Sequence, residues 1–101
     1  MRKCTINLTA AAEQDLAEIV EYIANDNPAA ALKLADEIQE NILRLEEFPT
    51  SGVIPKNRRL ARQGYRILII QSYLVFYCLP NDETVEIRRV ISGKRQYQFL
   101  L

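Results

Sequence analysis

The residues best suited to chemistry are basic and fall close together, within residues 56–66. They are Lys56, Arg58, Arg59, Arg62 and Arg66. No acidic residue lies between Glu47 and Asp82, so no neighbour in sequence neutralises these bases. Arginine binds phosphate by charge and by paired hydrogen bonds. The run therefore predicts a phosphate-contacting surface, and the alternative is a solvated loop whose arginines pair with acidic helices of the same chain.

A second basic cluster lies near the C-terminus and contains Arg88, Arg89, Lys94 and Arg95, with Tyr97 beside them. Arg88 and Arg89 are adjacent in a predicted strand, so we expect them to point to opposite faces of the sheet. A tyrosine beside cations can stack on a base or donate a proton while the cations hold phosphates. The alternative for Tyr97 is ordinary packing of the C-terminal tail onto the core.

The composition excludes several other kinds of site. The chain has no histidine, so acid–base chemistry has to proceed without imidazole. Its two cysteines, Cys4 and Cys78, are too few for a zinc site and are expected to be buried thiols rather than a disulfide. No apolar run approaches the ~20 residues of a membrane span, and no signal peptide is recognisable. We therefore expect a cytoplasmic protein with no metal, no cofactor and no membrane contact.

The charge is balanced in total but not along the chain. There are 13 basic and 13 acidic residues. Residues 1–47 carry ten acids against four bases, and residues 48–101 carry nine bases against three acids. The second half therefore favours binding to a polyanion or to an acidic protein surface.

The hydrophobic pattern predicts a strand, two helices and then three strands. Residues 3–8 alternate as a short strand, after which Thr9 is placed to cap a helix. Asn27 and Pro28 are typical of the start of a second helix, which we expect to run to about Glu47. Each predicted helix has an apolar stripe along one face. In the first helix the stripe consists of Ala12, Leu16, Ile19, Val20 and Ile23. In the second helix it consists of Ala31, Ala35, Ile38, Ile42 and Leu45.

Residues 65–71, 73–79 and 84–91 are rich in β-branched, aliphatic and aromatic residues and are separated by short turns. Consecutive strands joined in this way are antiparallel. We therefore predict an α+β fold with the order β-α-α-β-β-β, in which a helical hairpin packs on a curved antiparallel sheet of about four strands. Residues 1–101 form a single domain in this prediction.

Four segments carry a resemblance to a known family. They are DLAEIVEYIANDNPAAA (15–31), LEEFPTSG (45–52), GYRILIIQSYLVFYCL (64–79) and VEIRRVISGKRQY (85–97). In this order they resemble the RelE/ParE superfamily, the toxins of bacterial type II toxin–antitoxin systems. The resemblance implies a small cytoplasmic growth inhibitor, of the kind that stabilises plasmids. It also implies a cognate antitoxin that wraps the toxin with a helical or extended C-terminal segment in a hetero-oligomer.

The superfamily has two targets, and the resemblance implies different residues for each. RelE-like members cleave mRNA on the ribosome without a metal, and by position Arg66, Arg95 and Tyr97 match their catalytic residues. However, Leu68 and Leu74 stand where the archetypal nuclease has basic residues, and Ser92 stands where many relatives have histidine. The resemblance therefore favours the ParE-like branch, which poisons DNA gyrase, with the RelE-like endoribonuclease and an inactive antitoxin-binding module as alternatives. In either active case, the residues expected to contact nucleic acid or the target are Lys56, Arg58, Arg59, Arg62, Arg66, Arg89 and Lys94.

Overall fold

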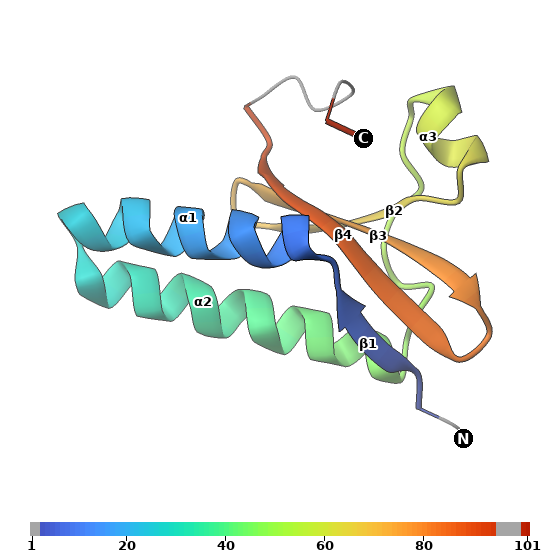
Figure 1. Ribbon diagram of the computed structural model, residues 1–101, viewed down its shortest axis with the longest axis horizontal. Coiled ribbons are helices and arrows are strands. Elements are labelled where there is room, and N and C mark those ends of the chain that lie inside the picture. Colours follow the sequence, from blue (N-terminus) through green and yellow to red (C-terminus); the bar gives the residue numbers. More distant parts are fainter. Residues whose placement is uncertain (1–2, 95–99) are drawn as a thin grey trace.

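A computed structural model describes residues 3–94 and 100–101 and confirms the predicted order of the main elements (Figure 1). The elements are β1 (Thr5–Leu8), α1 (Ala10–Asp26), α2 (Pro28–Leu43), the short 3-10 helix η1 (Arg44–Glu46), α3 (Arg58–Arg62), β2 (Arg66–Ile70), β3 (Tyr73–Asn81) and β4 (Thr84–Ser92). The fold is α+β, as predicted. The helices differ from the prediction in two details. The second helix changes to 3-10 geometry at Arg44, and the basic run contains a short helix, α3.

The two predicted helix caps are both present. The Thr9 side chain accepts a hydrogen bond from the Ala12 N–H at 3.1 Å, and the Asn27 side chain accepts one from the Ala30 N–H at the same distance. Pro28 occupies the first turn of α2, where its missing N–H leaves no bond unmade. The single residue Asn27 therefore ends α1 and starts α2, and this tight joint makes the two helices a hairpin.

The sheet has the strand order β1-β4-β3-β2 and is mixed rather than wholly antiparallel. Strands β2, β3 and β4 form the expected antiparallel meander. Strand β1 runs parallel to β4, with Thr5 opposite Thr84 and Leu8 opposite Ile87. Tight turns force antiparallel pairing only between the strands that they join, and β1 is separated from the meander by two helices. The expectation of an all-antiparallel sheet was wrong for this strand.

Strand β4 extends beyond the end of β1, and the start of α1 covers the exposed part of its edge. The Thr9 hydroxyl donates to the Arg88 carbonyl at 2.8 Å, and the Val90 N–H donates to the Asp15 carboxylate at 3.0 Å. The pairing with β3 shifts register at this level, from Arg89 to Ile87, so Arg88 is an extra residue in β4. Polar side chains of α1 thus replace the missing neighbour strand.

The sheet is covered on both faces. The face that we call the hairpin face carries Val75, Tyr77 and Ile87, which pack with Leu34 and Ile38 of α2. The opposite face, which we call the α3 face, carries a second apolar cluster. Its buried members are Leu60, Tyr65, Ile67, Phe76, Cys78 and Ile91. The α1–α2 hairpin and the short helix α3 therefore lie on opposite sides of the sheet, as the separation of their ribbons in Figure 1 illustrates.

Both cysteines are free thiols, in agreement with the prediction. Cys78 is buried, and burial raises the pKa of its thiol, whereas Cys4 is only partly buried. The second hairpin turn also differs slightly from expectation, because β3 continues through Pro80 to Asn81 before the chain reverses. Among the described helices, none is both long enough and apolar enough to cross a membrane.

Candidate functional surfaces

Arg66 is bound to a loop of its own chain. Its Nη1 donates to the carbonyl oxygens of Thr50 and Gly52, both at 3.0 Å. Arg66 lies opposite Tyr77 in the β2–β3 register, and this places its side chain on the hairpin face of the sheet. These two hydrogen bonds attach residues 50–52 of the loop to strand β2, so Arg66 has a structural role.

Tyr77 holds the same loop from within the core. Its hydroxyl accepts from the Gly52 N–H and donates to the Pro49 carbonyl, each at 2.8 Å. The side chain is fully buried, and this burial raises the pKa of the Tyr77 phenol, although the Gly52 hydrogen bond and the nearby Arg66 charge act in the other direction. A Cβ atom on Gly52 would lie 2.5 Å from the hydroxyl oxygen, so only glycine fits this contact without displacement.

Arg89 is also held within the fold. Its Nε and Nη2 donate to the two carboxylate oxygens of Asp15 at 2.7 and 2.9 Å, and its Nη1 reaches the Leu100 carbonyl at 3.3 Å. This bidentate hydrogen bonding with Asp15 raises the pKa of the Arg89 guanidinium. Arg88 points elsewhere, with its guanidinium 5.8 Å from the centre of the Tyr65 ring on the α3 face and its Nε 2.6 Å from Glu86.

The remaining bases of the 56–66 run are clustered around α3, and we call this group the α3 surface. It consists of Lys56, Arg58, Arg59 and Arg62, all exposed. The expected alternative, pairing with the acidic helices, does not occur for Arg58 and Arg62 in the part of the chain that the structure describes. Arg59 reaches the Leu101 carbonyl and the Gln63 side chain at 3.4 and 3.5 Å. Because Leu60 packs into the α3 face, the basic side chains around it project outward.

Three predicted site residues follow β4 in the sequence, namely Lys94, Arg95 and Tyr97. Lys94 is exposed, and its N–H lies 3.4 Å from the Ser92 hydroxyl. Arg95 and Tyr97 lie outside the described residues, so their convergence with Arg66 stays a prediction. In residues 3–94 and 100–101, no group of three metal-ligating side chains is arranged to hold an ion.

The two leucines that stand in place of nuclease cations lie on opposite faces of the sheet. Leu68 packs against the hairpin-face core, opposite Val75. Leu74 packs against the cluster of the α3 face, opposite Ile69, which is 65% exposed. The α3 face therefore presents a cross-strand pair of aliphatic side chains where the basic residue of the nuclease would stand.

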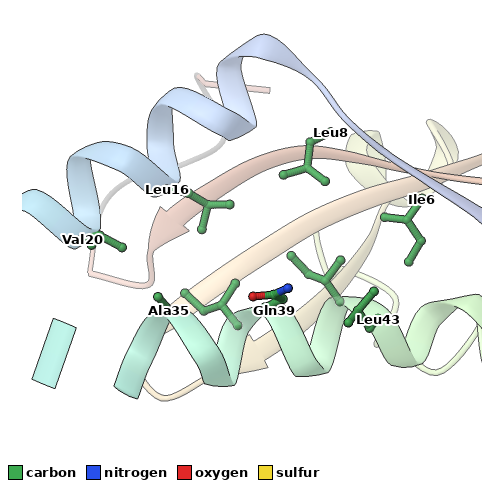
Figure 2. A pocket seen from close by; sticks show the side chains of 9 residues that line it. Ile6, Leu8, Leu16, Val20, Ala35, Gln39 and Leu43 are labelled. Atoms are coloured by element: carbon green, nitrogen blue, oxygen red, sulfur yellow. The ribbon is translucent and has the colours of Figure 1, made fainter. Parts of the chain in front are cut away.

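A groove between the helical hairpin and β1 was not predicted. It has a volume of about 400 Å³ and opens to solvent. The residues that line it are Ile6, Leu8, Leu16, Val20, Ala35, Ile38, Gln39, Ile42 and Leu43. Figure 2 shows side chains of α1 and α2 facing one another across it, with Ile6 and Leu8 on the β1 side. The sequence contained only part of the signal, because it showed the apolar stripes of the two helices but not that β1 is limited to Thr5–Leu8.

Comparison with known proteins gives a family match, similar solved structures and no curated relative. Residues 6–97 match a family model described as the ParE toxin of the type II toxin–antitoxin system parDE. A structure of a chromosomal ParDE toxin–antitoxin system from P. aeruginosa is similar in fold, with 18% identity, a TM-score of 0.74 and coverage of 91% of this chain and 98% of that chain. The toxin–antitoxin complex RelBE2 from Mycobacterium tuberculosis is similar at 25% identity and a TM-score of 0.57, over 89% of this chain and 98% of that chain. No curated protein matches the sequence.

Proposed function

The chain belongs to the ParE toxin family of type II toxin–antitoxin systems, and on that premise we propose that it arrests growth by poisoning DNA gyrase in the cytoplasm. We choose gyrase as the target because the α3 face is apolar. Ile69 and Leu74 are paired across two strands there, and neither can stabilise the charge that develops when a phosphodiester is cleaved. An exposed aliphatic side chain such as Ile69 is instead compatible with a surface that binds protein.

The position of Arg66 also favours a protein target. A RelE-like nuclease would use Arg66, Arg95 and Tyr97 together, with cations placed at the reacting phosphate. Arg66 donates to two loop carbonyls, so its use in catalysis would require the loop at residues 50–52 to release it. In the gyrase proposal Arg66 has a structural role, and the contacts to the target come from the exposed bases. These are Lys56, Arg58, Arg59, Arg62 and Lys94.

The direct test is DNA supercoiling by purified gyrase in the presence of the purified toxin. We expect inhibition at micromolar toxin and its relief by a stoichiometric amount of the cognate antitoxin. Unimpaired supercoiling at that concentration would overturn the proposed target. Mapping of mRNA ends during in vitro translation then tests the nuclease. We expect no new ends, whereas cleavage that disappears in Arg95→Ala would support the RelE-like mechanism instead.

Induced expression in a bacterial host tests activity as such. We expect growth to stop and to resume when the antitoxin is induced. Normal growth with folded protein present would support the third possibility, an inactive module that only binds its antitoxin.

The groove described above is the proposed binding site for the cognate antitoxin. The lining of the groove is apolar apart from Gln39. A helical or extended segment with an apolar face could bury the lining side chains that β1 does not cover. The ParDE and RelBE2 structures described above are both of toxin–antitoxin systems, and this supports an antitoxin as the occupant.

The antitoxin site can be tested with two leucines of α2. Leu43 lines the groove and is 49% exposed, whereas Leu32 is 68% exposed and is not part of the lining. We expect Leu43→Glu to weaken antitoxin binding while the variant still arrests growth, and Leu32→Glu to behave as wild type. Equal antitoxin affinity for the two variants would exclude the groove as the site.

A further inference from the structure

Three bases of the α3 surface have no acidic partner on the described part of this chain. Lys56, Arg58 and Arg62 form no ion pair and no side-chain hydrogen bond there. The backbone that carries them is fixed, because the Asn57 side chain caps α3 at 3.1 Å and Leu60 is buried. Arg58 and Arg62 are four residues apart in α3, so they lie on one side of it and repel each other. An anionic partner would relieve this repulsion.

The α3 surface has no apolar side chain that could anchor another protein. Between residues 56 and 63, Leu60 is buried and Ala61 is half-buried, and the fully exposed side chains are those of Lys56, Gln63 and the three arginines of α3. Interfaces between proteins have aromatic or aliphatic anchors at their centre and few charged residues there. Interfaces with a nucleic-acid backbone are more polar and much more positive, with arginine and lysine bound to phosphate oxygens. The α3 surface therefore fits a nucleic-acid backbone better than a protein surface.

The charges of the whole molecule also determine which side a polyanion meets. Helices α1 and α2 carry eight acidic residues and one base, Lys33. They cover the hairpin face, whereas α3 lies on the other side of the sheet, and Figure 1 shows it far from the turn between the two helices. The chain has no net charge, so it has no general attraction to a polyanion. A polyanion would be repelled by the hairpin and attracted to the α3 surface.

We infer that the α3 surface binds the phosphate backbone of duplex DNA, so that the toxin engages gyrase where the enzyme holds its DNA. Arg58 and Arg62 would each donate to phosphate oxygens, and Lys56 would add a third charge. Arg59 already donates to the Leu101 carbonyl and to the Gln63 side chain, and the inference does not depend on it. Contacts to phosphate carry no sequence information, so the binding is independent of base sequence and sensitive to salt. The inference rests on the proposed function, because DNA is the substrate of gyrase, and it names what these bases contact.

The first test measures binding of the purified toxin to a fluorescent DNA duplex by anisotropy, without gyrase, over about 50–200 mM salt. We expect the logarithm of the association constant to fall against that of the salt concentration with a slope of about −3, because each contacted phosphate contributes about −0.9. The double variant Arg58→Gln/Arg62→Gln should have a slope shallower by about 2 and bind about 60-fold more weakly at ~0.1 M salt. Arg58→Lys/Arg62→Lys keeps both charges and should keep the slope. Lys33→Gln is the matched control, because Lys33 is an exposed base on α2, and it should bind as wild type.

The second test repeats the gyrase supercoiling assay with the same variants. We expect Arg58→Gln/Arg62→Gln to need at least about tenfold more toxin for the same inhibition, as at a binding hot spot. The lysine double variant and Lys33→Gln should inhibit as wild type does. All the substituted side chains are exposed, and circular dichroism should show every variant folded.

The outcomes separate this inference from the proposed function. If wild type binds DNA with the expected slope but leaves gyrase unaffected, the proposed function fails and DNA binding by the α3 surface stands. If wild type inhibits gyrase and the glutamine double variant inhibits it equally well, the inference is refuted while the gyrase target stands. If the glutamine double variant loses inhibition but wild type and variant bind DNA alike, the bases contact an acidic surface of gyrase itself, and the inference is overturned.

Discussion

Replacing Tyr77 with phenylalanine tests how the loop of residues 49–52 is held. The substitution keeps the buried ring and removes only the hydroxyl, which accepts from Gly52 and donates to Pro49. Gly52 is buried, so its N–H would lose its partner with no water to replace it. Pro49 is partly exposed, so we expect its carbonyl to bond to water instead.

The expected loss follows from these two environments. Leaving the buried Gly52 N–H without an acceptor costs about 1–3 kcal/mol. Replacing the hydrogen bond from Tyr77 to the Pro49 carbonyl with one from water costs about 0.5–1.5 kcal/mol. We therefore expect Tyr77→Phe to lower the free energy of unfolding by about 2–4 kcal/mol, or roughly 10–20 °C in Tm. Urea unfolding should show a lower midpoint with an unchanged slope. Tyr73→Phe is the matched control, because the Tyr73 hydroxyl makes no hydrogen bond within the described part of the chain, and its cost should stay below about 0.5 kcal/mol.

The pH dependence provides a second, independent measurement. Burial raises the pKa of the Tyr77 phenol above 10.0 in the folded state, so the folded chain retains this proton where the unfolded chain releases it. The corresponding stability is fully present below pH 10 and is lost as the pH rises through the folded-state pKa, with a slope of up to about 1.4 kcal/mol per pH unit. Cys78 adds a loss that starts near pH 9.0, but it is common to wild type and variant. A Tyr77→Phe variant as stable as Tyr73→Phe, with the same alkaline slope as wild type, would refute the reasoning.

Three further changes are expected to lower the free energy of unfolding. Asp15→Ala removes the carboxylate partner of the Arg89 guanidinium and of the Val90 N–H, and should cost about 2–4 kcal/mol. A double-mutant cycle should show that replacing Arg89 as well recovers much of this loss. Gly52→Ala places a new Cβ 2.5 Å from the Tyr77 hydroxyl and displaces the ring. Thermal unfolding should show a loss of about 1–3 kcal/mol in the free energy of unfolding. Asn27→Ala removes the α2 cap and should cost about 1 kcal/mol in urea unfolding, whereas Asn27→Ser should restore most of it.

Local features of this fold could be predicted from the sequence. The caps at Thr9 and Asn27 depend on one side chain and a backbone N–H three residues away, so short-range patterns are sufficient to find them. The meander of β2 to β4 follows from tight turns between apolar runs. Helix α3 was missed because it has five residues, and what stabilises it is an Asn57 cap together with burial of Leu60, inside a stretch whose composition is that of a loop.

The roles of individual charges could not be predicted, because their partners are distant in sequence. Asp15 and Arg89 are 74 residues apart, and nothing in either segment marks the other as its partner. Arg66 was expected on the working surface, yet its partners are carbonyls 14 and 16 residues away that any sequence could supply. The groove has the same origin, since periodicity identifies the apolar stripes but not whether a neighbouring strand is long enough to cover them.

The parallel pairing of β1 with β4 also constrains the order in which the chain can fold during synthesis. Thr5 meets Thr84 across almost the whole length of the chain, and β4 is an interior strand of the sheet. The helical hairpin emerges from the ribosome early, but the surface that it covers is complete only when residues 84–92 have followed. Contacts of such long range are slow to form, because a large loop has to close before they stabilise anything. Nascent chains that lack the last strand should therefore remain unfolded and harmless to the cell that makes them, until synthesis of the toxin is nearly finished.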